Sequence, residues 1–298
     1  MEFGSLFDSI MTKGKATLDE YAICSVNVPD AEKKALDYIC TCTKDKFEDL
    51  SKEYIYDRCM ECEYQKRWSA DAKYEHLKPY SSYYNIKQSG KKIISEQDWL
   101  DAIQMWKVFR EDPYLKTLFG TKNTKDIEYI YQAKFKTNIF VEEVGEIEVR
   151  IMPDLLVVNH IDKTVQPVDL KTSSVPAYDF AKNFLMFRYD IQAALYVEVL
   201  RKIMDSDEDY KDYTILPFLF TDISRSDKVP VTFVYDSQDE SQINGLSFTD
   251  ASGERTFTYK NWRTLVKEIS QYEQSQAKVP SYICTDRPND LLSLLSKR

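Results

Sequence analysis

The sequence predicts an α/β (α+β) fold in which an α-rich N-terminal part leads into a core of strands and helices. Three observations predict it: helical spacing of apolar residues before residue 113, apolar strand patterns between residues 126 and 235, and amphipathic helices within and after them. The chain has 298 residues, 43% of them hydrophobic, which is enough for one large domain or a domain with an appendage.

The α-rich part is expected at 6–120, the core at 121–285 and a tail at 286–298, while Met1-Glu-Phe-Gly-Ser5 resembles a cloning remnant. Helices are predicted at 31–41, at Ser51–Trp68 and from Ser95 to Asp112. Their inward residues are expected to be Ile55, Cys59 and Cys62 in the second helix, and Trp99, Ile103 and Trp106 in the third.

The core contains five predicted strands and a final helix that turns Trp262, Leu265, Ile269 and Tyr272 inward. These elements are predicted at Asp126–Lys136, Glu146–Val158, Thr164–Ser173, Ile215–Ile223, Pro230–Tyr235 and Lys260–Gln276. The polar run Asn159–Lys163 is typical of a hairpin turn between the second and third strands.

Two carboxylates and an ammonium group are expected to meet on this hairpin. Side chains alternate along a strand, so Asp169 and Lys171 point to the same face. A turn near residue 161 pairs the end that carries Asp154 with the end that carries Asp169. Two carboxylates beside a main-chain carbonyl suit Mg²⁺ or Mn²⁺, and a neighbouring lysine can hold a water that attacks phosphorus. The alternative is a buried ion pair between Asp169 and Lys171, with Asp154 an unrelated turn residue.

The helix after the hairpin adds polar side chains. Arg188, Gln192 and Tyr196 recur at steps of four on one face. Beside them runs a predicted core stripe of Phe180, Phe184, Phe187, Ile191 and Leu195. Because this helix follows the lysine strand directly, its polar face is expected to reach the same site.

In this order, the motifs resemble the PD-(D/E)xK nuclease superfamily, and specifically its RecE-like (exonuclease VIII type) and RecB-like branch. The matching elements are Arg150, Asp154, Asp169-Leu-Lys171-Thr172, Phe180-Ala181 and Tyr189-Asp-Ile-Gln192-Ala-Ala-Leu-Tyr196. The resemblance covers about residues 90 to 200, with a weaker echo to about residue 280. It implies a restriction-endonuclease-like core, with a mixed central sheet flanked by helices.

The resemblance also implies a function, a Mg²⁺-dependent (or Mn²⁺-dependent) DNA exonuclease. Asp154, Asp169 and the Leu170 carbonyl would hold the metal, Lys171 would position the attacking water, and Gln192 and Tyr196 would support the site or the DNA backbone. Family members of this type digest one strand of linear double-stranded DNA from 5′ to 3′ as ring-shaped homo-oligomers. They generate single strands for an annealing protein in phage-type recombination.

Two rival functions remain open: a RecB-like repair nuclease or endonuclease on the same core, and a non-catalytic DNA-binding protein that kept the fold. The residue that completes the metal site is also open. Glu63 and Glu61 of the Ser51–Trp68 helix are candidates, and Glu128 is a third. RecE-like relatives tend to have a histidine at the helix position, and this helix has none, so a solvated helix face is the alternative for either glutamate.

Cysteine spacing indicates a second candidate metal site. Cys40-x-Cys42 and Cys59-x-x-Cys62 together offer four thiolates to zinc, although buried cysteines of a helix are often simple core residues. An iron–sulfur cluster of the kind found in some RecB-like relatives needs a C-terminal trio of cysteines, and Cys284 stands alone there. Six cysteines in a chain of this size favour a reducing compartment over a disulfide framework.

Composition excludes several other functions. Glycine is scarce, with 7 residues, and no G-x-x-x-x-G-K phosphate loop is present. The 2 histidines make Ser-His-Asp or Cys-His catalysis improbable. The formal net charge of −9 counts against a general nucleic-acid coat but permits a narrow basic channel on an acidic body. Without an 18-residue apolar run or a signal-peptide pattern, the expected location is the cytoplasm of a bacterium or phage-infected cell, with no membrane partner.

Overall fold

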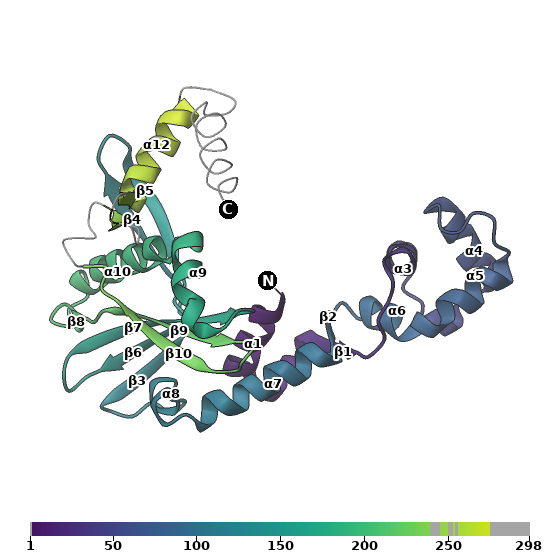
Figure 1. Cartoon of the computed structure of the whole chain (residues 1–298), viewed down its shortest axis with the longest axis horizontal. Coiled ribbons are helices and arrows are strands. Elements are labelled where there is room, and N and C mark those ends of the chain that lie inside the picture. The colour runs from purple at the N-terminus through teal and green to yellow at the C-terminus, as the bar shows by residue number, and fades with distance from the viewer. Residues whose placement is uncertain (1, 239–244, 250–252, 254–255, 275–298) are drawn as a thin grey trace. The chain divides into compact units, whose positions relative to one another are not determined.

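The computed structural model describes residues 2–238, 245–249, 253 and 256–274 (Figure 1). The chain divides into two compact units. The first unit comprises Met1–Thr117, Lys171–Ala177 and Ile223–Pro230, and the second comprises Leu118–Leu170, Tyr178–Asp222 and Val231–Arg298. The predicted tail at 286–298 lies outside the described residues.

The first unit is mainly helical. Its elements are α1 (Glu2–Lys13), η1 (Gly14–Ala16), α2 (Thr17–Glu20), β1 (Tyr21–Cys24), α3 (Asp30–Cys42), η2 (Phe47–Asp49), α4 (Lys52–Glu61), α5 (Ala70–Leu77), η3 (Lys78–Tyr80), α6 (Ser81–Gln88), β2 (Lys92–Ser95) and α7 (Glu96–Glu111), followed by α8 (Pro113–Leu118) at its boundary. Strands β1 and β2 pair in parallel. The α-rich character expected of the N-terminal part is confirmed.

Helix α7 begins where the capping pattern predicts. The Ser95 hydroxyl accepts a hydrogen bond from the Asp98 N–H at 3.0 Å, which satisfies one of the donors that a helix N-terminus leaves open. The predicted buried face was wrong by one position, because Ala102, Met105 and Phe109 are fully buried while the two tryptophans and Ile103 are half-buried.

The described part of the second unit contains the central sheet and two separate two-stranded sheets. Its elements are β3 (Ile127–Tyr131), β4 (Phe135–Val141), β5 (Gly145–Ile151), β6 (Leu155–Asn159), β7 (Thr164–Ser173, entering the first unit at Lys171), η4 (Ala177–Asp179), α9 (Phe180–Phe187), α10 (Tyr189–Asp205), β8 (Thr214–Ile215), β9 (Phe218–Ser224), β10 (Pro230–Tyr235), β11 (Leu246–Thr249), β12 (Thr256–Tyr259) and α12 (Trp262–Gln274).

A mixed central sheet organises this unit. Among the described residues its strand order is β10-β9-β7-β6-β3, with β8 also pairing with β7. The pairs β3–β6 and β6–β7 are antiparallel, whereas β7–β8 is parallel. All seven residues of β9 are buried, as expected of a strand covered on both faces. The protein is therefore a mixed α/β structure with a mixed central sheet flanked by helices.

The strand predicted over Glu146–Val158 is two strands in different sheets. Strand β5 pairs with β4, and β6 pairs with β3 and β7. Between them stands Met152-Pro153-Asp154. Proline has no N–H to donate and restricts the residue before it, so the ladder is interrupted there and the chain changes sheets.

Helix α10 forms the centre of the core of the second unit. Its buried residues Val197 and Leu200 pack in one cluster with Val149 of β5 and with Phe218 and Phe220 of β9. Figure 1 shows α10 between the central sheet and the β4–β5 hairpin. Both faces of the helix are therefore engaged. Among the helices that the structure describes, none combines the length and the apolar character needed to cross a membrane.

Candidate functional site

The β6–β7 hairpin brings the two predicted carboxylates to one end of a strand pair. Leu155 pairs with Val168 and Asn159 pairs with Thr164. Continuing this register by one residue places Asp154 opposite Asp169. The predicted pairing of these two ends is confirmed.

Asp154 is held by the main chain on both sides. Its Oδ2 accepts a hydrogen bond from the Leu170 N–H at 2.8 Å, and its carbonyl accepts one from the Gln132 N–H at 3.1 Å. In an antiparallel strand the N–H and the C=O of one residue face the same edge, so the Leu170 carbonyl faces the edge where Asp154 lies. These are the oxygen groups that the sequence predicted for a metal.

Asp169 is buried, with 4% of its surface exposed, and it contacts α10. Gln192 Nε2 donates to Asp169 Oδ1 at 2.5 Å. Lys171 lies two positions further along β7 and is half-buried. Strand alternation directs its side chain to the same face as Asp169.

Tyr196 follows Gln192 by one helical turn and completes this group. Burial raises the pKa of Tyr196, and the nearby charge of Asp169 raises it further, while hydrogen bonding to Gln192 and to the Met152 main chain lowers it. With a raised pKa the phenol stays protonated at neutral pH and can donate a hydrogen bond. The structure thus brings together Asp154, Asp169, Gln192 and Tyr196, as predicted.

The helix predicted to run through residue 188 is broken there. Arg188 has φ 55° and ψ 49°, the left-handed conformation, and separates α9 from α10. Its guanidinium donates to both carboxylate oxygens of buried Asp190, at 3.0 and 2.9 Å, and to the Lys260 carbonyl at 2.5 Å. It also lies 5.0 Å from the centre of the Tyr259 ring. Sequence periodicity gave no signal for this break, because two of these partners, the Tyr259 ring and the Lys260 carbonyl, come from a distant part of the chain.

The break also changes the predicted core stripe. Phe180 is buried, and Phe184, Ile191 and Leu195 pack against the core, as expected. Phe187 was expected in the core, yet it is 58% exposed. It is the last residue of α9, and the chain turns at Arg188.

The predicted role of Glu63 does not fit its local structure. The helix expected over Ser51–Trp68 ends at Glu61, and Glu63 has φ 61° outside it. Its carboxylate is 74% exposed and pairs with Lys66 Nζ at 2.7 Å, which lowers the pKa of Glu63. Glu63 was expected within this helix, as a metal ligand or on a solvated face; it lies outside the helix, which stops two residues earlier, and its side chain is exposed.

The two alternatives to Glu63 have other partners. Glu61 accepts a hydrogen bond from the Tyr38 hydroxyl at 2.9 Å and pairs with Arg58 at 2.8 Å. Glu128 lies opposite Val158, four positions from Asp154 along the strand, and is 3.6 Å from His160 Nε2. Four residues of strand span about 13 Å. Among the described residues no group of three or more His, Cys, Asp or Glu side chains is placed to hold a metal ion.

His160 and Arg150 each have a local partner. His160, in the turn between β6 and β7, is half-buried, and its Nδ1 is 2.9 Å from the Tyr213 hydroxyl. Arg150 lies on the exposed face of β5, where it pairs with Glu148 at 2.6 Å. Its guanidinium is 74% exposed. Arg150, the basic residue of the nuclease-like motif, thus forms an ion pair within the β4–β5 hairpin.

The cysteines proposed for zinc differ in their surroundings. Cys40 and Cys59 are buried, and burial raises the pKa of each thiol to about 12. Cys62 is half-buried, with a pKa that burial also raises, and Cys42 is exposed. Cys40 and Cys59 belong to one apolar cluster of the first unit and Cys62 packs against it, which agrees with the alternative that these cysteines are core residues.

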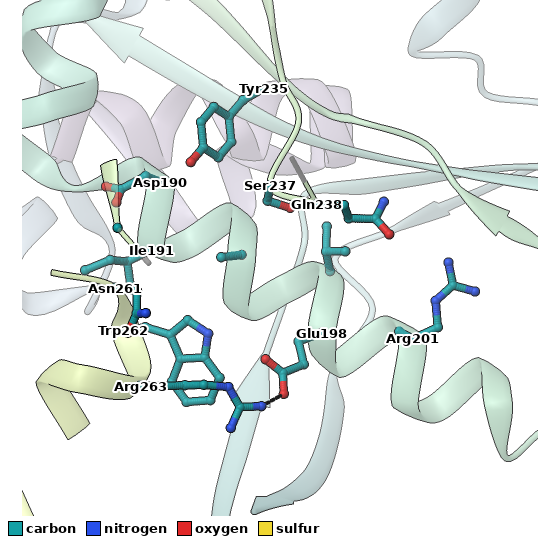
Figure 2. Close-up of a pocket in the computed structure, with 13 residues that line it drawn as sticks. Asp190, Ile191, Glu198, Arg201, Tyr235, Ser237, Gln238, Asn261, Trp262 and Arg263 are labelled. Carbon is teal, nitrogen blue, oxygen red and sulfur yellow. Dashed lines mark hydrogen bonds and ion pairs between the residues drawn. The ribbon is translucent and has the colours of Figure 1, made fainter. Parts of the chain in front are cut away.

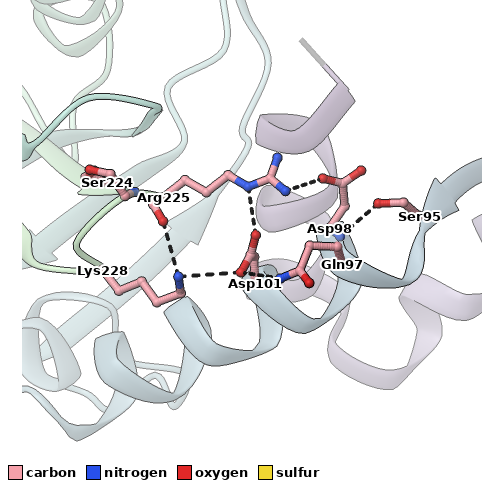
Figure 3. Close-up of polar contacts among 8 residues, drawn as sticks. Ser95, Gln97, Asp98, Asp101, Ser224, Arg225 and Lys228 are labelled. Carbon is pink, nitrogen blue, oxygen red and sulfur yellow. Dashed lines mark hydrogen bonds and ion pairs between the residues drawn. The ribbon is translucent and has the colours of Figure 1, made fainter.

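An ionic network within the first unit holds the turn after β9 (Figure 3). Arg225 contacts Asp98 at 2.6 Å and Asp101 at 2.9 Å, and Lys228 lies 3.5 Å from Asp101. The Arg225 N–H donates to the carbonyl of Ser173, the last residue of β7, at 2.7 Å. Helix α7 is therefore tied to the end of the strand that carries Lys171.

Sequence reasoning also missed a buried acid in the sheet. Asp222 is 1% exposed and lies on β9, the strand next to β7. The signal was a carboxylate inside the otherwise apolar run Phe218-Leu-Phe-Thr-Asp-Ile223. A buried carboxylate in such a run needs partners, so it marks a position with more than a packing role.

A cavity of about 270 Å³ lies on the other side of α10 (Figure 2). Its lining includes Ala194, Val197 and Arg201 of the helix. At about 100° per residue, these project opposite to Gln192 and Tyr196. Glu198 and Arg263 at the cavity form an ion pair, and Arg201 donates to the Tyr213 carbonyl at 3.2 Å. The cavity is separate from the carboxylate site.

Comparison of the chain with protein-family models and with curated proteins finds no match in either set.

Proposed function

We propose that this chain is a Mg²⁺-dependent DNA exonuclease with a RecE-like PD-(D/E)xK core. One observation carries the proposal: the β6–β7 register sets Asp154 opposite Asp169, and α10 adds a hydrogen bond from Gln192 to Asp169. Two carboxylates on paired strands, each held by a specific donor, form the oxygen-rich site that Mg²⁺ prefers.

The residues present fit such a metal by their chemistry. Asp154, Asp169 and the Leu170 carbonyl would hold it, and a bound Mg²⁺ supplies positive charge that stabilises the phosphate in the transition state. Lys171 shares the Asp169 face and orients the attacking water, and its charge steadies the negative phosphate. Gln192 keeps the Asp169 carboxylate oriented, and the protonated Tyr196 donates a hydrogen bond within the site.

The finer features of the proposal rest on the motif resemblance. They are digestion of one strand from 5′ to 3′ at the ends of linear duplex DNA, a ring-shaped homo-oligomer, and delivery of single strands to an annealing protein during phage-type recombination. The place of action would be the cytoplasm of a bacterium or a phage-infected cell. Light scattering at micromolar concentration should then give a mass above the 35.0 kDa of one chain.

The deciding assay is digestion of a linear duplex labelled at either the 5′ or the 3′ end, with and without Mg²⁺. The full chain should release label from the 5′ end when the metal is present. Asp154→Asn and Asp169→Asn should lose cleavage, because a neutral amide binds Mg²⁺ much less well. Mg²⁺ should raise the thermal midpoint of the parent but not that of either variant. Full activity in either variant refutes the assignment.

Two further measurements, on a closed circular plasmid and on DNA binding, identify the rivals. Cleavage of a closed circular plasmid indicates an endonuclease or a RecB-like repair nuclease, because an exonuclease requires an end. DNA binding with no turnover at any divalent ion indicates a non-catalytic protein that retained the fold.

A further inference from the structure

A series of nearly parallel aromatic rings leads from the core of the second unit to its surface. The Phe220 ring is fully buried and stacks on Tyr189, with centroids 5.7 Å apart and planes at 21°. Tyr189 stacks in turn on Phe187, at 5.8 Å and 28°. Phe187 ends the series and is 58% exposed.

The inner rings are fixed by further stacking. Phe180 lies 5.9 Å from Tyr189 with planes at 24°, and 4.5 Å from Phe233 with planes at 15°. Both Phe180 and Phe220 are buried. The orientation of the exposed ring is therefore set in advance by the core, so a ligand that stacks on Phe187 loses little entropy in ordering it.

Other exposed side chains lie on α9 and just before it. Met186 is 66% exposed, Tyr178 is 78% exposed, and the Lys182 side chain is 80% exposed. Lys182 precedes Phe187 by five residues, about 140° around α9, so the exposed ring acts through its own face rather than with this lysine.

This ring series is connected to the candidate site by its middle member. Tyr189 is the first residue of α10, and Gln192 lies one turn further along the same helix. Met152, whose main chain contacts Tyr196, also has an exposed side chain, at 43%. Large exposed apolar side chains thus adjoin two of the segments that supply Asp154, Gln192 and Tyr196.

We propose that the outer face of Phe187 stacks on an unpaired nucleobase of a DNA strand. This inference rests on the proposed function, because it assigns the substrate's bases a place next to the phosphodiester site. A pre-oriented, exposed ring is the device with which single-strand binding proteins stack bases on aromatic side chains. A contact between copies of the chain is the competing occupant of this face, and the test below separates the two.

The test measures binding in EDTA, where metal-dependent cleavage cannot occur. The probe is a duplex with a short single-stranded overhang that carries 2-aminopurine, whose fluorescence falls when the base stacks, and the reference is the blunt duplex. Phe187→Ser should bind the overhang about tenfold or more weakly and abolish the quenching, since one base stack contributes on this scale. Phe187→Trp should restore both.

Phe140→Ser is the matched control. Phe140 is 61% exposed, similar to Phe187, but it lies on β4 opposite Glu146, at the far end of the β4–β5 hairpin from Met152. This variant should bind like the parent. Thermal midpoints of all variants should agree closely, because each substitution is made at an exposed side chain.

Several results would overturn the proposal. Parental affinity and quenching in Phe187→Ser, or an equal loss in Phe140→Ser, would exclude a specific base platform. A change of mass in light scattering without a change in DNA binding would instead assign Phe187 to a contact between copies of the chain. Failure of the nuclease proposal is distinguishable: a parent that shows Phe187-dependent quenching but no cleavage with any divalent ion refutes the enzyme and leaves the platform.

Discussion

Gln192 donates a hydrogen bond to Asp169 over 2.5 Å, and this contact joins the beginning of α10 to β7. Asp169 is almost fully buried, so the amide replaces water that the carboxylate would otherwise bind. The position of the helix and the orientation of the carboxylate therefore depend on each other.

The first prediction concerns this contact. Gln192→Ala should lower the free energy of unfolding by about 1–3 kcal/mol, because a buried acceptor loses its donor. Urea denaturation measures the change. Gln271→Ala is the control, since Gln271 is exposed and lies 3.5 Å from Glu143, and it should change stability by less than about 0.5 kcal/mol. Equal effects of the two substitutions would contradict the structural importance of the Gln192 contact.

A second prediction concerns the left-handed Arg188. Arg188→Ala should destabilise by about 3 kcal/mol or more, because buried Asp190 loses its bidentate partner. Arg188→Gly removes the same guanidinium but accepts φ 55° without strain, so it should be the more stable of the two by about 1 kcal/mol. Thermal denaturation compares them. If Ala proves as stable as Gly, the left-handed backbone at residue 188 is not strained.

A third prediction separates catalysis from structure at Lys171. If Lys171 positions water and steadies the phosphate charge, Lys171→Met should reduce turnover by about 10² or more while DNA and metal binding persist. Lys171→Arg should be nearly as inactive, because its fork is wider and does not readily release a proton. Single-turnover kinetics and DNA binding are measured together. A Lys171→Met protein that cuts at the parental rate would reduce Lys171 to an ion-pair partner.

The fourth prediction is a pH dependence in the first unit. Burial raises the pKa of Glu32, but hydrogen bonds from its main chain, His76 and Tyr64 outweigh burial, and its net pKa is lowered from 4.5. A lowered folded-state pKa contributes stability above the unfolded pKa, and that stability is lost as the pH falls through the folded value. Between pH 6 and pH 3, about the range of a carboxyl titration, Glu32→Gln should therefore lose less stability than the parent.

Urea denaturation at several pH values measures this dependence. Glu75→Gln is the control, because Glu75 is 59% exposed and lies 3.9 Å from Lys78. Its pH profile should match that of the parent. A Glu32→Gln profile as steep as the parental one would show that the acid sensitivity arises elsewhere.

The fifth prediction concerns a buried charge. Lys73 is fully buried, its Nζ lies 4.1 Å from the centre of the Tyr56 ring, and no described residue forms a hydrogen bond with that nitrogen. A desolvated cation–π contact contributes about 2 kcal/mol, which is less than the several kcal/mol that burying an ammonium costs. Lys73→Met should therefore raise the free energy of unfolding by about 1 kcal/mol or more.

The matched control is Lys34→Met on the exposed side of α3 in the same unit, which should have little effect on stability.

A second test combines substitutions at Tyr56 and Lys73. Tyr56→Leu should destabilise the parent more than it destabilises Lys73→Met, because the ring stabilises a charge only where one is present. If the single substitution Lys73→Met instead lowers the free energy of unfolding, the Lys73 ammonium is stabilised by more than its contact with the Tyr56 ring.

Patterns in the local sequence were sufficient to predict much of the fold and of the candidate site. The alternating runs and the polar turn near residue 161 predicted the pairing of Asp154 with Asp169, because strand period and turn position together determine register. Spacing of four predicted that Gln192 and Tyr196 lie together on one helix. The capping pattern at Ser95 predicted the start of α7. Each of these features depends on residues that are close in the sequence.

Tertiary structure decided what depends on distant partners. The break at Arg188 requires Asp190, Tyr259 and the Lys260 carbonyl, and only folding brings the latter two to the arginine. That break turned Phe187 from an expected core residue into the exposed end of an aromatic series. Glu63 fell outside its helix because the helix ended at Glu61. Helical periodicity describes which side chains share a face, but the free energy of distant contacts decides where a helix ends and which face is buried.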